Sequence, residues 1–383
     1  MIAVGLMSGT SLDGIDAALV RIRPSGASYR IDLFNFRTVP YEPELLESLR
    51  AALSPNEGSV RAVAQLNRAL GLAYAAAAES VRSDMPIDYV ACHGQTLWHD
   101  GPAQITLQAG DPFVIRDAVR ASVCYNFRSG DCAAGGQGAP LVPYVDALLM
   151  RSAQEDRVAV NIGGIANITV LPRGEALDDV VAFDTGPGVM LLDAFLAQRT
   201  GGERTVDLGG ESALRGTCDT QALRAMLDDP FFTDSPPKTT GRERFGADFL
   251  ERHAPVLAPL SFEDGLATLA ALTAQSIADA VRAFAPKGAR VLVSGGGRRN
   301  EAVMRALRER LAGFSVEGSD AMIHSDAKEA IAFAVLGYET LRGRPANVPR
   351  ATGAREPAVL GAIAPYRLLS LLSKVETECR TSP

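Results

Sequence analysis

Two apolar runs near the start of the chain are joined by a polar segment that contains an Asp-Gly pair. The runs are Ala3–Leu6 and Ala17–Val20, and the segment between them includes Gly9, Thr10, Ser11, Leu12, Asp13, Gly14, Ile15 and Asp16. This pattern predicts a β-hairpin with a tight turn that needs glycine. Glycine lets the backbone approach a ligand, and successive turn N–H groups form a concave site for an anion. The Thr10 and Ser11 hydroxyls are further donors, and Asp13 and Asp16 suit a hydrated magnesium ion. Taken alone, the segment also fits an ordinary polar turn.

Glycines follow three more apolar runs. One run leads into Asn161-Ile162-Gly163-Gly164, one into Phe183-Asp184-Thr185-Gly186-Pro187-Gly188, and one into Ser294-Gly295-Gly296-Gly297. Ligands of α/β proteins bind at the carboxyl ends of strands, where turn N–H groups and helix N-termini attract anions. A single glycine pair is typical of a packing turn. Several of them beside acids and hydroxyls favour a polyphosphate site.

Short β-type runs alternate with longer helical patterns, which predicts an α/β fold. The length of 383 residues and the two similar starts indicate two domains, 1–150 and 151–383, with a boundary near residues 151–156. Strands are expected at residues 2–6, 15–22, 31–39, 89–92, 121–125, 158–162, 168–171, 180–183 and 290–294. Helices are expected at residues 43–52, 59–84, 140–151, 188–198, 265–285, 300–312 and 326–341.

Composition excludes several classes of protein. The net charge of −7 argues against a broad surface for nucleic acid or anionic membranes. The five cysteines are scattered and predict reduced thiols, with no disulfide framework and no zinc site. The start of the chain has no targeting pattern, and the alanine-rich stretch at 266–285 is interrupted by polar residues. We therefore expect a cytoplasmic protein.

The absence of common nucleotide motifs narrows the type of site. The sequence has no Walker P-loop, no dinucleotide or protein-kinase glycine loop, no nucleophile elbow and no metalloprotease motif. The remaining mode of nucleotide binding uses two β-hairpin turns, one in each domain, to hold the nucleotide. That mode is typical of the superfold shared by actin, sugar kinases and heat-shock ATPases.

Seven segments together make the chain resemble the anhydro-N-acetylmuramic acid kinase family from end to end. They are GLMSGTSLDGID (5–16), HGQT (93–96), DCAAGGQGAPLVP (131–143), NIGGIAN (161–167), FDTGPG (183–188), PKTTGRE (237–243) and DAKEA (326–330). The resemblance implies a two-domain actin-like (ribonuclease H-like) ATPase fold with the active site in the interdomain cleft. It implies ATP, with Mg²⁺ carried by the nucleotide and no metal held by the protein alone, and it allows a homodimer. Two residues depart from the family pattern: Asn126 stands where Asp is usual, and Val189 where Asn is usual.

The resemblance also implies roles for individual residues. Family members open 1,6-anhydro-N-acetylmuramic acid with water and phosphorylate the released hydroxyl, and Asp184 matches the position of the catalytic base. Phosphoryl transfer mainly needs positioning and charge neutralisation, which the glycine turns and Mg²⁺ would supply. The residues expected to bind the sugar are His93, Gln95, Thr96, Arg128, Asp131 and Glu329.

Simpler roles stay open for several of these residues. Arg128 also fits a solvated loop residue, and His93 a structural hydrogen-bonding group. Asp326 and Glu329 have the spacing of a helix capping box, which would account for Asp326. Lys238 and Arg242 lie in a loop that suits either phosphate contact or a mobile surface.

Two other functions compete with this prediction. A non-catalytic sugar sensor has the same fold without needing a base, and a kinase for another sugar needs no ring opening. Release of ADP that depends on the anhydro-sugar separates these functions.

Overall fold

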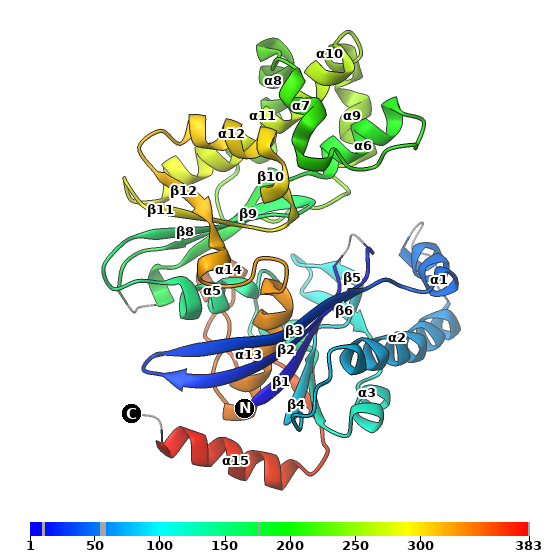
Figure 1. Ribbon diagram of the computed structural model, residues 1–383, viewed down its shortest axis with the longest axis vertical. Coiled ribbons are helices and arrows are strands. Elements are labelled where there is room, and N and C mark those ends of the chain that lie inside the picture. Colours follow the sequence, from blue (N-terminus) through cyan, green and yellow to red (C-terminus); the bar gives the residue numbers. More distant parts are fainter. Residues whose placement is uncertain (10–11, 54–58, 175–176, 382–383) are drawn as a thin grey trace. The chain divides into compact units, whose positions relative to one another are not determined.

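The computed structural model describes residues 1–9, 12–53, 59–174 and 177–381, and it contains two compact units. Unit 1 consists of Met1–Leu149 and Ala327–Pro383, and unit 2 of Met150–Asp326. Each unit has its own sheet and its own apolar core (Figure 1).

The sheet of unit 1 begins with an antiparallel meander and continues with parallel strands. Neighbouring strands follow the order β13-β7-β4-β1-β2-β3, in which β1, β4 and β7 are parallel. The bounds are β1 Ile2–Met7, β2 Ile15–Ser25, β3 Ser28–Val39, β4 Tyr89–Cys92, β7 Ser122–Tyr125 and β13 Ala362–Ala364.

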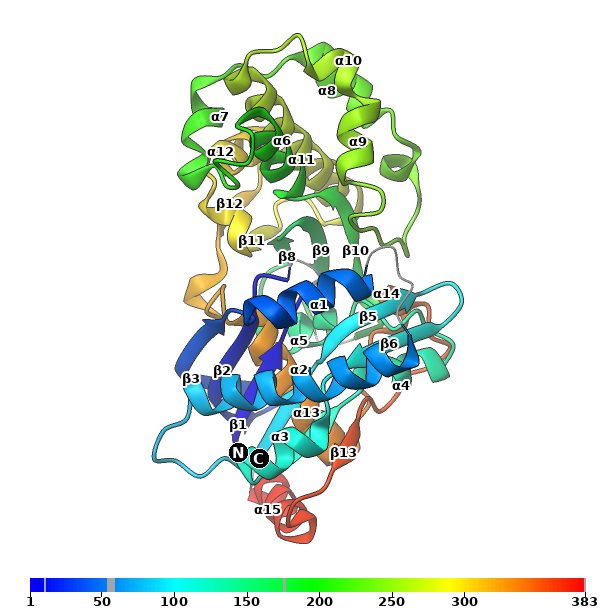
Figure 2. The same cartoon turned by 90° about the vertical axis from the view of Figure 1, so that its right-hand side faces the viewer.

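Strand β1 alternates between the two faces of this sheet, and different helices cover these faces (Figure 2). Ile2, Val4 and Leu6 belong to one apolar cluster with α2 (Val60–Ser80). Gly5 faces α13 (Lys328–Arg342), where a Cβ atom would lie 1.8 Å from the carbonyl oxygen of Ala330. Only glycine allows this close approach of helix to strand.

The contact of α13 with β1, β2 and β4 explains a difference from the predicted domains. Residues 327–383 had been assigned to the second domain, but they pack in unit 1. The boundary after Leu149 lies close to the predicted one. The chain returns to unit 1 because the buried face of α13 needs this sheet, a long-range contact that local patterns do not show.

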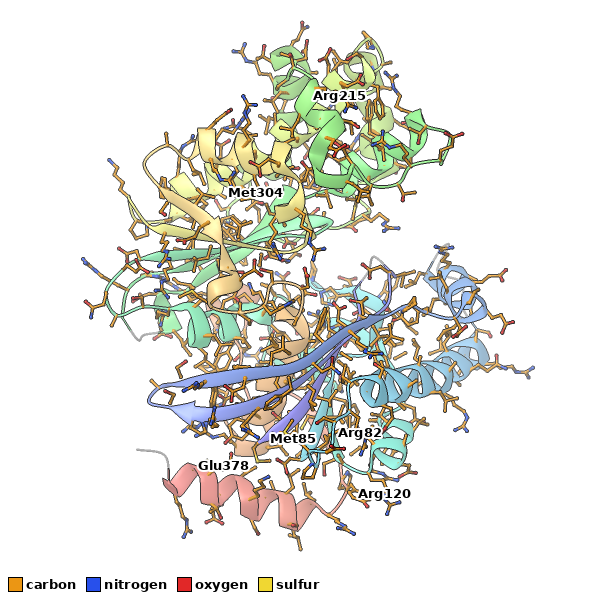
Figure 3. The ribbon with its side chains drawn as sticks, viewed as in Figure 1. Arg82, Met85, Arg120, Arg215, Met304 and Glu378 are labelled. Atoms are coloured by element: carbon orange, nitrogen blue, oxygen red, sulfur yellow. The ribbon has the colours of Figure 1, made fainter. Side chains whose placement is uncertain are left out.

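The last helix, α15 (Leu368–Thr381), is held to unit 1 by polar contacts. Lys374 forms an ion pair with Asp88 at 2.7 Å, and the Tyr338 hydroxyl donates to Glu378 at 3.0 Å. Figure 3 labels Glu378 on this helix. The other elements of unit 1 are α1 Pro43–Leu53, β5 Gln95–Asp100, β6 Ile105–Ala109, α3 Pro112–Val119, α4 Phe127–Ala133, α5 Val142–Met150 and α14 Pro349–Thr352.

Unit 2 repeats the strand arrangement of unit 1. Its order is β10-β9-β8-β11-β12, with an antiparallel meander from β8 to β10 and parallel pairing of β8, β11 and β12. This is the ribonuclease H-like topology in each half, so the α/β class and the two similar halves are confirmed. The bounds are β8 Arg157–Ile162, β9 Ile165–Leu171, β10 Val181–Pro187, β11 Arg290–Ser294 and β12 Ser315–Gly318.

The core of unit 2 lies between this sheet and long helices. Val158, Val160 and Ile162 belong to one buried cluster with residues of α11 (Phe262–Phe284) and α6 (Met190–Arg199). The other helices are α7 Glu211–Arg215, α8 Thr220–Leu227, α9 Ala247–Arg252, α10 Ala254–Leu257 and α12 Glu301–Arg310, with short 3-10 turns at 177–179, 208–210, 230–233, 296–299 and 319–321.

Two local expectations were wrong. The first hairpin does not have a tight two-residue turn, because Met7 pairs with Asp16 and residues 8–15 separate the two in sequence. The capping box does not form either: α13 begins at Lys328 after Ala327, and Asp326 forms an ion pair with Arg299 instead. In the part of the chain that the structure describes, no helix is both long and apolar enough to cross a membrane.

Candidate active site

The proposed base, Asp184, lies inside the edge strand β10. It pairs with Asn167 of β9, and the register shifts between Asp184 and Gly186. Gly186 has a φ of 141°, and a Cβ there would lie 2.7 Å from the Phe232 ring. The irregularity therefore depends on glycine, and it lies next to the carboxylate.

A loop after residue 233 binds the backbone and the side chain of Asp184. The Asp184 N–H donates to the carbonyl oxygen of Lys238 at 3.1 Å. The Thr240 N–H donates to Asp184 Oδ2 at 2.9 Å. Among the described residues, Asp184 Oδ1 accepts no hydrogen bond. One carboxylate oxygen is thus held, and the other is left for a ligand.

The pKa of Asp184 is raised to about 7 by burial. The Thr240 N–H opposes this rise, the nearby charge of Glu243 adds to it, and Lys238 opposes it. A carboxylate with a pKa near neutrality is a stronger proton acceptor than an ordinary aspartate, which suits a general base.

The Gly163-Gly164 turn of unit 2 is joined to the start of α6. The Gly163 carbonyl oxygen accepts from Val189 N–H at 2.9 Å, and the Gly164 carbonyl oxygen from Gly188 N–H at 2.7 Å. A Cβ on Gly188 would lie 2.0 Å from the Gly163 oxygen, so Gly188 is needed for packing. A Cβ on Gly163 would lie 3.4 Å from the carbonyl oxygen of Ile165 and 3.8 Å from Asn161 Nδ2, which are ordinary contact distances, so a small side chain would fit there.

The unusual Val189 takes part in the turn through its backbone. Its side chain packs, partly buried, against the apolar core of unit 2. Nothing in this arrangement needs a polar side chain at the position.

The three glycines after β11 have different surroundings. Gly295 has a φ of 84°, and Cβ atoms on Gly295 and Gly297 would lie 2.6 Å and 2.3 Å from Ile162 atoms. The carboxamide of Asn161 also lies against Gly295. These two glycines therefore permit close packing on β8. Only Gly296 has open space where a Cβ would be.

Parallel strands bring the predicted residues of unit 1 to one edge of its sheet. The loop 8–14 follows β1, His93 follows β4, and Arg128 comes shortly after β7. Because β1, β4 and β7 run in the same direction, these segments lie at the same sheet edge. Thr10 and Ser11 lie outside the described residues.

Gln95 is fully buried and supports the first glycine loop. Its Nε2 donates to the Gly9 carbonyl oxygen at 3.2 Å, and its Oε1 accepts from the Tyr41 hydroxyl at 2.9 Å. Thr96, expected at the sugar as well, lies in β5 and accepts from Gln108 at 3.2 Å. Both ends of the Gln95 carboxamide are occupied within the chain, which indicates a positioning role.

The buried His93 and the partly exposed Arg128 form a hydrogen-bonded pair. Arg128 Nε donates to His93 Nε2 at 2.9 Å, and Arg128 Nη1 donates to the Gly138 carbonyl oxygen at 2.8 Å. Burial and the charge of Arg128 hold the pKa of His93 well below its usual value, so the imidazole is neutral. Burial lowers the pKa of Arg128 to about 10, against the opposing charge of Glu329. Such a guanidinium is poorly solvated and suits an anionic ligand.

Asp131 is a structural carboxylate in this fold. Its side chain is 0% exposed and accepts from Gly138 N–H at 2.8 Å, Asn347 Nδ2 at 2.7 Å and Thr352 Oγ1 at 2.7 Å. These bonds join α4 to the segment around α14. Asp131 therefore supports the loop that binds Arg128, in place of the predicted contact with the sugar.

Glu329 lies in the first turn of α13 and is partly exposed. Burial raises the pKa of its carboxyl, and the charges of Asp16 and Asp13 raise it further, whereas Lys328 and Arg128 lower it. The structure thus brings the charges of Asp13, of Asp16 at the start of β2 and of Arg128 close enough to shift the pKa of Glu329. Among the described residues, no group of three or more His, Cys, Asp or Glu side chains has a geometry that would hold a metal ion.

The remaining predicted residues have local roles. Asn126 adopts a left-handed conformation before α4, with a φ of 57°, and its side chain accepts from Ser129 at 2.6 Å. Arg242 is exposed. Lys238 donates to the Phe231 carbonyl oxygen at 2.7 Å, and it also lies over the Phe231 ring.

A pocket of about 260 Å³ in unit 2 is lined by Phe183 and Thr185, the two neighbours of Asp184 in β10, but not by Asp184. Successive side chains of a strand point to opposite faces. This pocket therefore belongs to a different side of the strand from the carboxylate.

Comparisons with known proteins give the relatives of this chain. Residues 1–366 match the model of a family described as anhydro-N-acetylmuramic acid kinase. A protein of that name from Caldanaerobacter subterraneus is 40% identical over 95% of this chain and 96% of its own length. A protein of the same name from Francisella tularensis is 40% identical over 94% of this chain and 97% of its own length. Among solved structures, the chain is similar to a ROK family glucokinase from Streptomyces griseus at 12% identity, covering 88% of this chain and 99% of the other, with a TM-score of 0.38. A likeness of that size shows no shared substrate.

The role of Asp131 gives a test. The Asp131→Ala variant should unfold with a free energy lower by roughly 3 kcal/mol or more, because it leaves three buried donors without an acceptor. Thermal or denaturant unfolding measures this difference. The control is Asp117→Ala, whose side chain is 70% exposed and should change stability little. Unchanged stability of Asp131→Ala would contradict the structural role.

Proposed function

The chain belongs to the anhydro-N-acetylmuramic acid kinase family, and from this premise we propose that it converts 1,6-anhydro-N-acetylmuramic acid and ATP into N-acetylmuramic acid 6-phosphate and ADP. The observation that carries this proposal is Asp184, a carboxylate with a pKa of about 7 and one oxygen without a partner among the described residues. It lies in a strand that leads into Gly188, whose N–H donates to the Gly164 carbonyl oxygen of the Gly163-Gly164 turn.

The proposed reaction balances with water as a reactant. The water oxygen attacks the anomeric carbon, and one of its protons passes to Asp184 Oδ1. The bond between the anomeric carbon and the bridging oxygen breaks, and that oxygen takes the γ-phosphoryl group of ATP. ADP leaves, and Asp184 later returns its proton to solvent. The phosphoryl step mainly requires positioning and neutralisation of charge.

Backbone groups are proposed to hold the phosphates. In unit 2, no atom lies closer than 3.4 Å to the place of a Cβ on Gly163, and we assign a phosphate to the backbone of this turn. In unit 1, we assign the same role to the first loop, from Gly9 to Gly14, with Mg²⁺ entering as part of the nucleotide substrate. The carboxylates of Asp13 and Asp16 suit water molecules bound to this magnesium ion. Gly186, Gly188, Gly295 and Gly297 act by shaping the backbone, and Gly296 offers open space for the nucleotide.

The polar group of unit 1 is proposed to bind the sugar. A guanidinium has five N–H donors, and in the described part of the chain Arg128 uses Nε and Nη1 for internal bonds. Its remaining donors suit the lactyl carboxylate of the muramic acid. Glu329, with its raised pKa, is a candidate partner for a sugar hydroxyl. His93 holds the guanidinium in place as a neutral acceptor.

The two competing functions, a non-catalytic sugar sensor and a kinase for another sugar, would require different properties of these residues. A sugar sensor needs no proton acceptor, so the raised pKa of Asp184 would serve no purpose in it. A kinase for a sugar with a free hydroxyl would use the same base without consuming water. The product therefore decides among the three functions.

The reaction predicts a defined product and a defined inactive variant. Incubation with ATP, magnesium and the anhydro-sugar should give ADP and a sugar phosphate heavier than the substrate by one water and one phosphoryl group. In ¹⁸O-labelled water the phosphoryl group should stay unlabelled.

Asp184→Asn should lower turnover by roughly 10²–10⁴-fold, because its amide keeps the shape but takes no proton. Mass spectrometry identifies the product, and ADP release measures the turnover of the wild type and of the variant. Titration of the variant with ATP is the control. Near-normal turnover of Asp184→Asn would remove this residue from the mechanism.

The pH profile should report the carboxyl of Asp184. Only its ionised form accepts a proton, so kcat/KM, which reports the pKa of the ligand-free enzyme, should rise with pH and reach half its maximum at about pH 7. Glu243→Gln removes a charge that raises this pKa, so the midpoint should move to lower pH. Steady-state rates between about pH 5 and pH 9 check this, with melting curves at each pH as the control. A rate that stays constant over this range would contradict the prediction.

The phosphate role of the second turn predicts a selective loss of nucleotide binding. Gly163→Ala adds a methyl group that meets its nearest neighbours at ordinary contact distances of 3.4 Å and 3.8 Å, so the variant should fold normally but bind ATP roughly tenfold or more weakly. Calorimetric titration measures the affinity. Gly318→Ala is the matched control, since a Cβ there also meets nothing closer than 3.5 Å. A folded Gly163→Ala protein with unchanged affinity would show that this turn does not hold phosphate.

A further inference from the structure

The loop that contains Thr240 is bonded to the base from two sides. Lys238 accepts the Asp184 N–H through its carbonyl oxygen, and the Thr240 N–H binds Asp184 Oδ2 at 2.9 Å. The loop therefore follows the edge strand β10 at the point where the strand becomes irregular. Both bonds use backbone atoms of the loop, so they form whatever side chain stands at residue 240.

The side-chain hydroxyl of Thr240 has no role in holding this loop. Thr240 Oγ1 is buried, and it has no hydrogen-bond partner among the described residues. Other threonines of unit 2 find partners: Thr185 donates to Ala166 O at 3.2 Å, Thr273 to Gly188 O at 2.6 Å and Thr268 to Asp264 O at 2.7 Å. A buried hydroxyl without a partner costs free energy, so it indicates a polar ligand that the chain itself does not supply.

Covalent geometry limits how far the Thr240 hydroxyl can lie from the Asp184 carboxylate. The Thr240 hydroxyl and the amide that binds Asp184 Oδ2 belong to one residue, so Oγ1 stays near the carboxylate. Asp184 Oδ1 has no partner among the described residues. One small polar molecule can therefore bind a carboxylate oxygen of Asp184 and the Thr240 hydroxyl together.

We propose that Thr240 Oγ1 binds the water molecule that attacks the sugar, as a second contact beside Asp184. This inference rests on the proposed function. A water molecule has two protons, and two acceptors orient it fully. Asp184 Oδ1 takes the proton that leaves during attack. Thr240 Oγ1 accepts a hydrogen bond from the proton that stays in the new anomeric hydroxyl. The lone pair of the water oxygen then points to the anomeric carbon.

The contact has a mechanistic purpose. A base alone leaves water free to rotate about a single hydrogen bond, whereas two acceptors hold it in the orientation needed for attack. The second acceptor is uncharged, so it fixes the water without competing with Asp184 for the proton. Thr240 therefore acts on the hydrolytic half of the reaction and not on nucleotide binding.

Three variants separate this role from a structural one. Thr240→Val keeps the shape and the N–H to Asp184 but lacks the hydroxyl, and Thr240→Ser keeps the hydroxyl. Thr239→Val changes the exposed neighbour in the same loop and is the matched control. The valine variant should lower kcat by roughly 10–100-fold, because one positioned contact to the reacting water is lost. The serine variant should stay within a few-fold of the wild type, and Thr239→Val should be unchanged.

The pH profile supplies a readout that a folding defect does not imitate. The Thr240 N–H still binds Asp184 in the valine variant, so the midpoint of its pH profile should stay at about pH 7 while the maximum falls. The KM for ATP and the melting temperature should also stay unchanged.

Each contrary result has a distinct meaning. Wild-type kcat for Thr240→Val would overturn the inference and leave the base assignment of Asp184 standing. Equal losses in the serine and valine variants with lowered melting temperatures would assign the hydroxyl a structural role, which also overturns it. A wild-type protein that forms no sugar phosphate would instead overturn the proposed function, and this inference with it.

Discussion

The direction of the strands is the constraint on which the rest of the structure depends. In each unit an antiparallel meander places its first and third strands in the same direction, and the following strands pair in parallel with the first. All these strands then end at one edge of the sheet. In unit 1 this edge gathers the first glycine loop, His93 and the start of α4 with Arg128. In unit 2 it gathers the Gly163 turn, Asp184 and Gly295. Polar residues and glycine turns that are far apart in the sequence lie together within each unit because they follow the carboxyl ends of strands that run in the same direction.

Glycines allow helices and loops to pack closely against the strands at these edges. Gly5 lets α13 lie against β1, which brings Glu329 to the first loop of unit 1. Gly188 lets the start of α6 bind the carbonyls of the second turn, and Gly295 and Gly297 let the next loop pack on β8. These glycines are structural. A Cβ on Gly296 would meet no atom within 4 Å, and one on Gly163 would make only ordinary contacts, so these two glycines suit direct contact with a ligand. The glycine-rich appearance of the sequence thus combines two physical roles that only the surroundings separate.

Sequence patterns were most successful where a local property decides the structure. The apolar runs of β1, β4 and β11 and the long periodic helices were predicted within a few residues of their observed positions. The capping box at Asp326 failed because an ion pair with Arg299 competes for the same carboxylate. Gln95 and Asp131, which were expected to contact the sugar, are both buried, and their polar atoms are hydrogen-bonded within the chain. Burial and hydrogen-bond partners are properties of the folded chain, and no spacing in the sequence reports them.

The sequence by itself determined the α/β class, the repeated glycine turns and the identity of the proposed base, because periodicity, glycine content and short motifs are local. Only the tertiary structure decided that residues 327–383 belong to unit 1, that Asp184 has a pKa of about 7, and that Thr240 lies beside it with an unpartnered hydroxyl among the described residues. Each of these depends on groups distant in sequence: α13 against β1, and residues 238–240 against β10. A carboxylate becomes a base near neutral pH through desolvation, and desolvation exists only after the chain has packed around it.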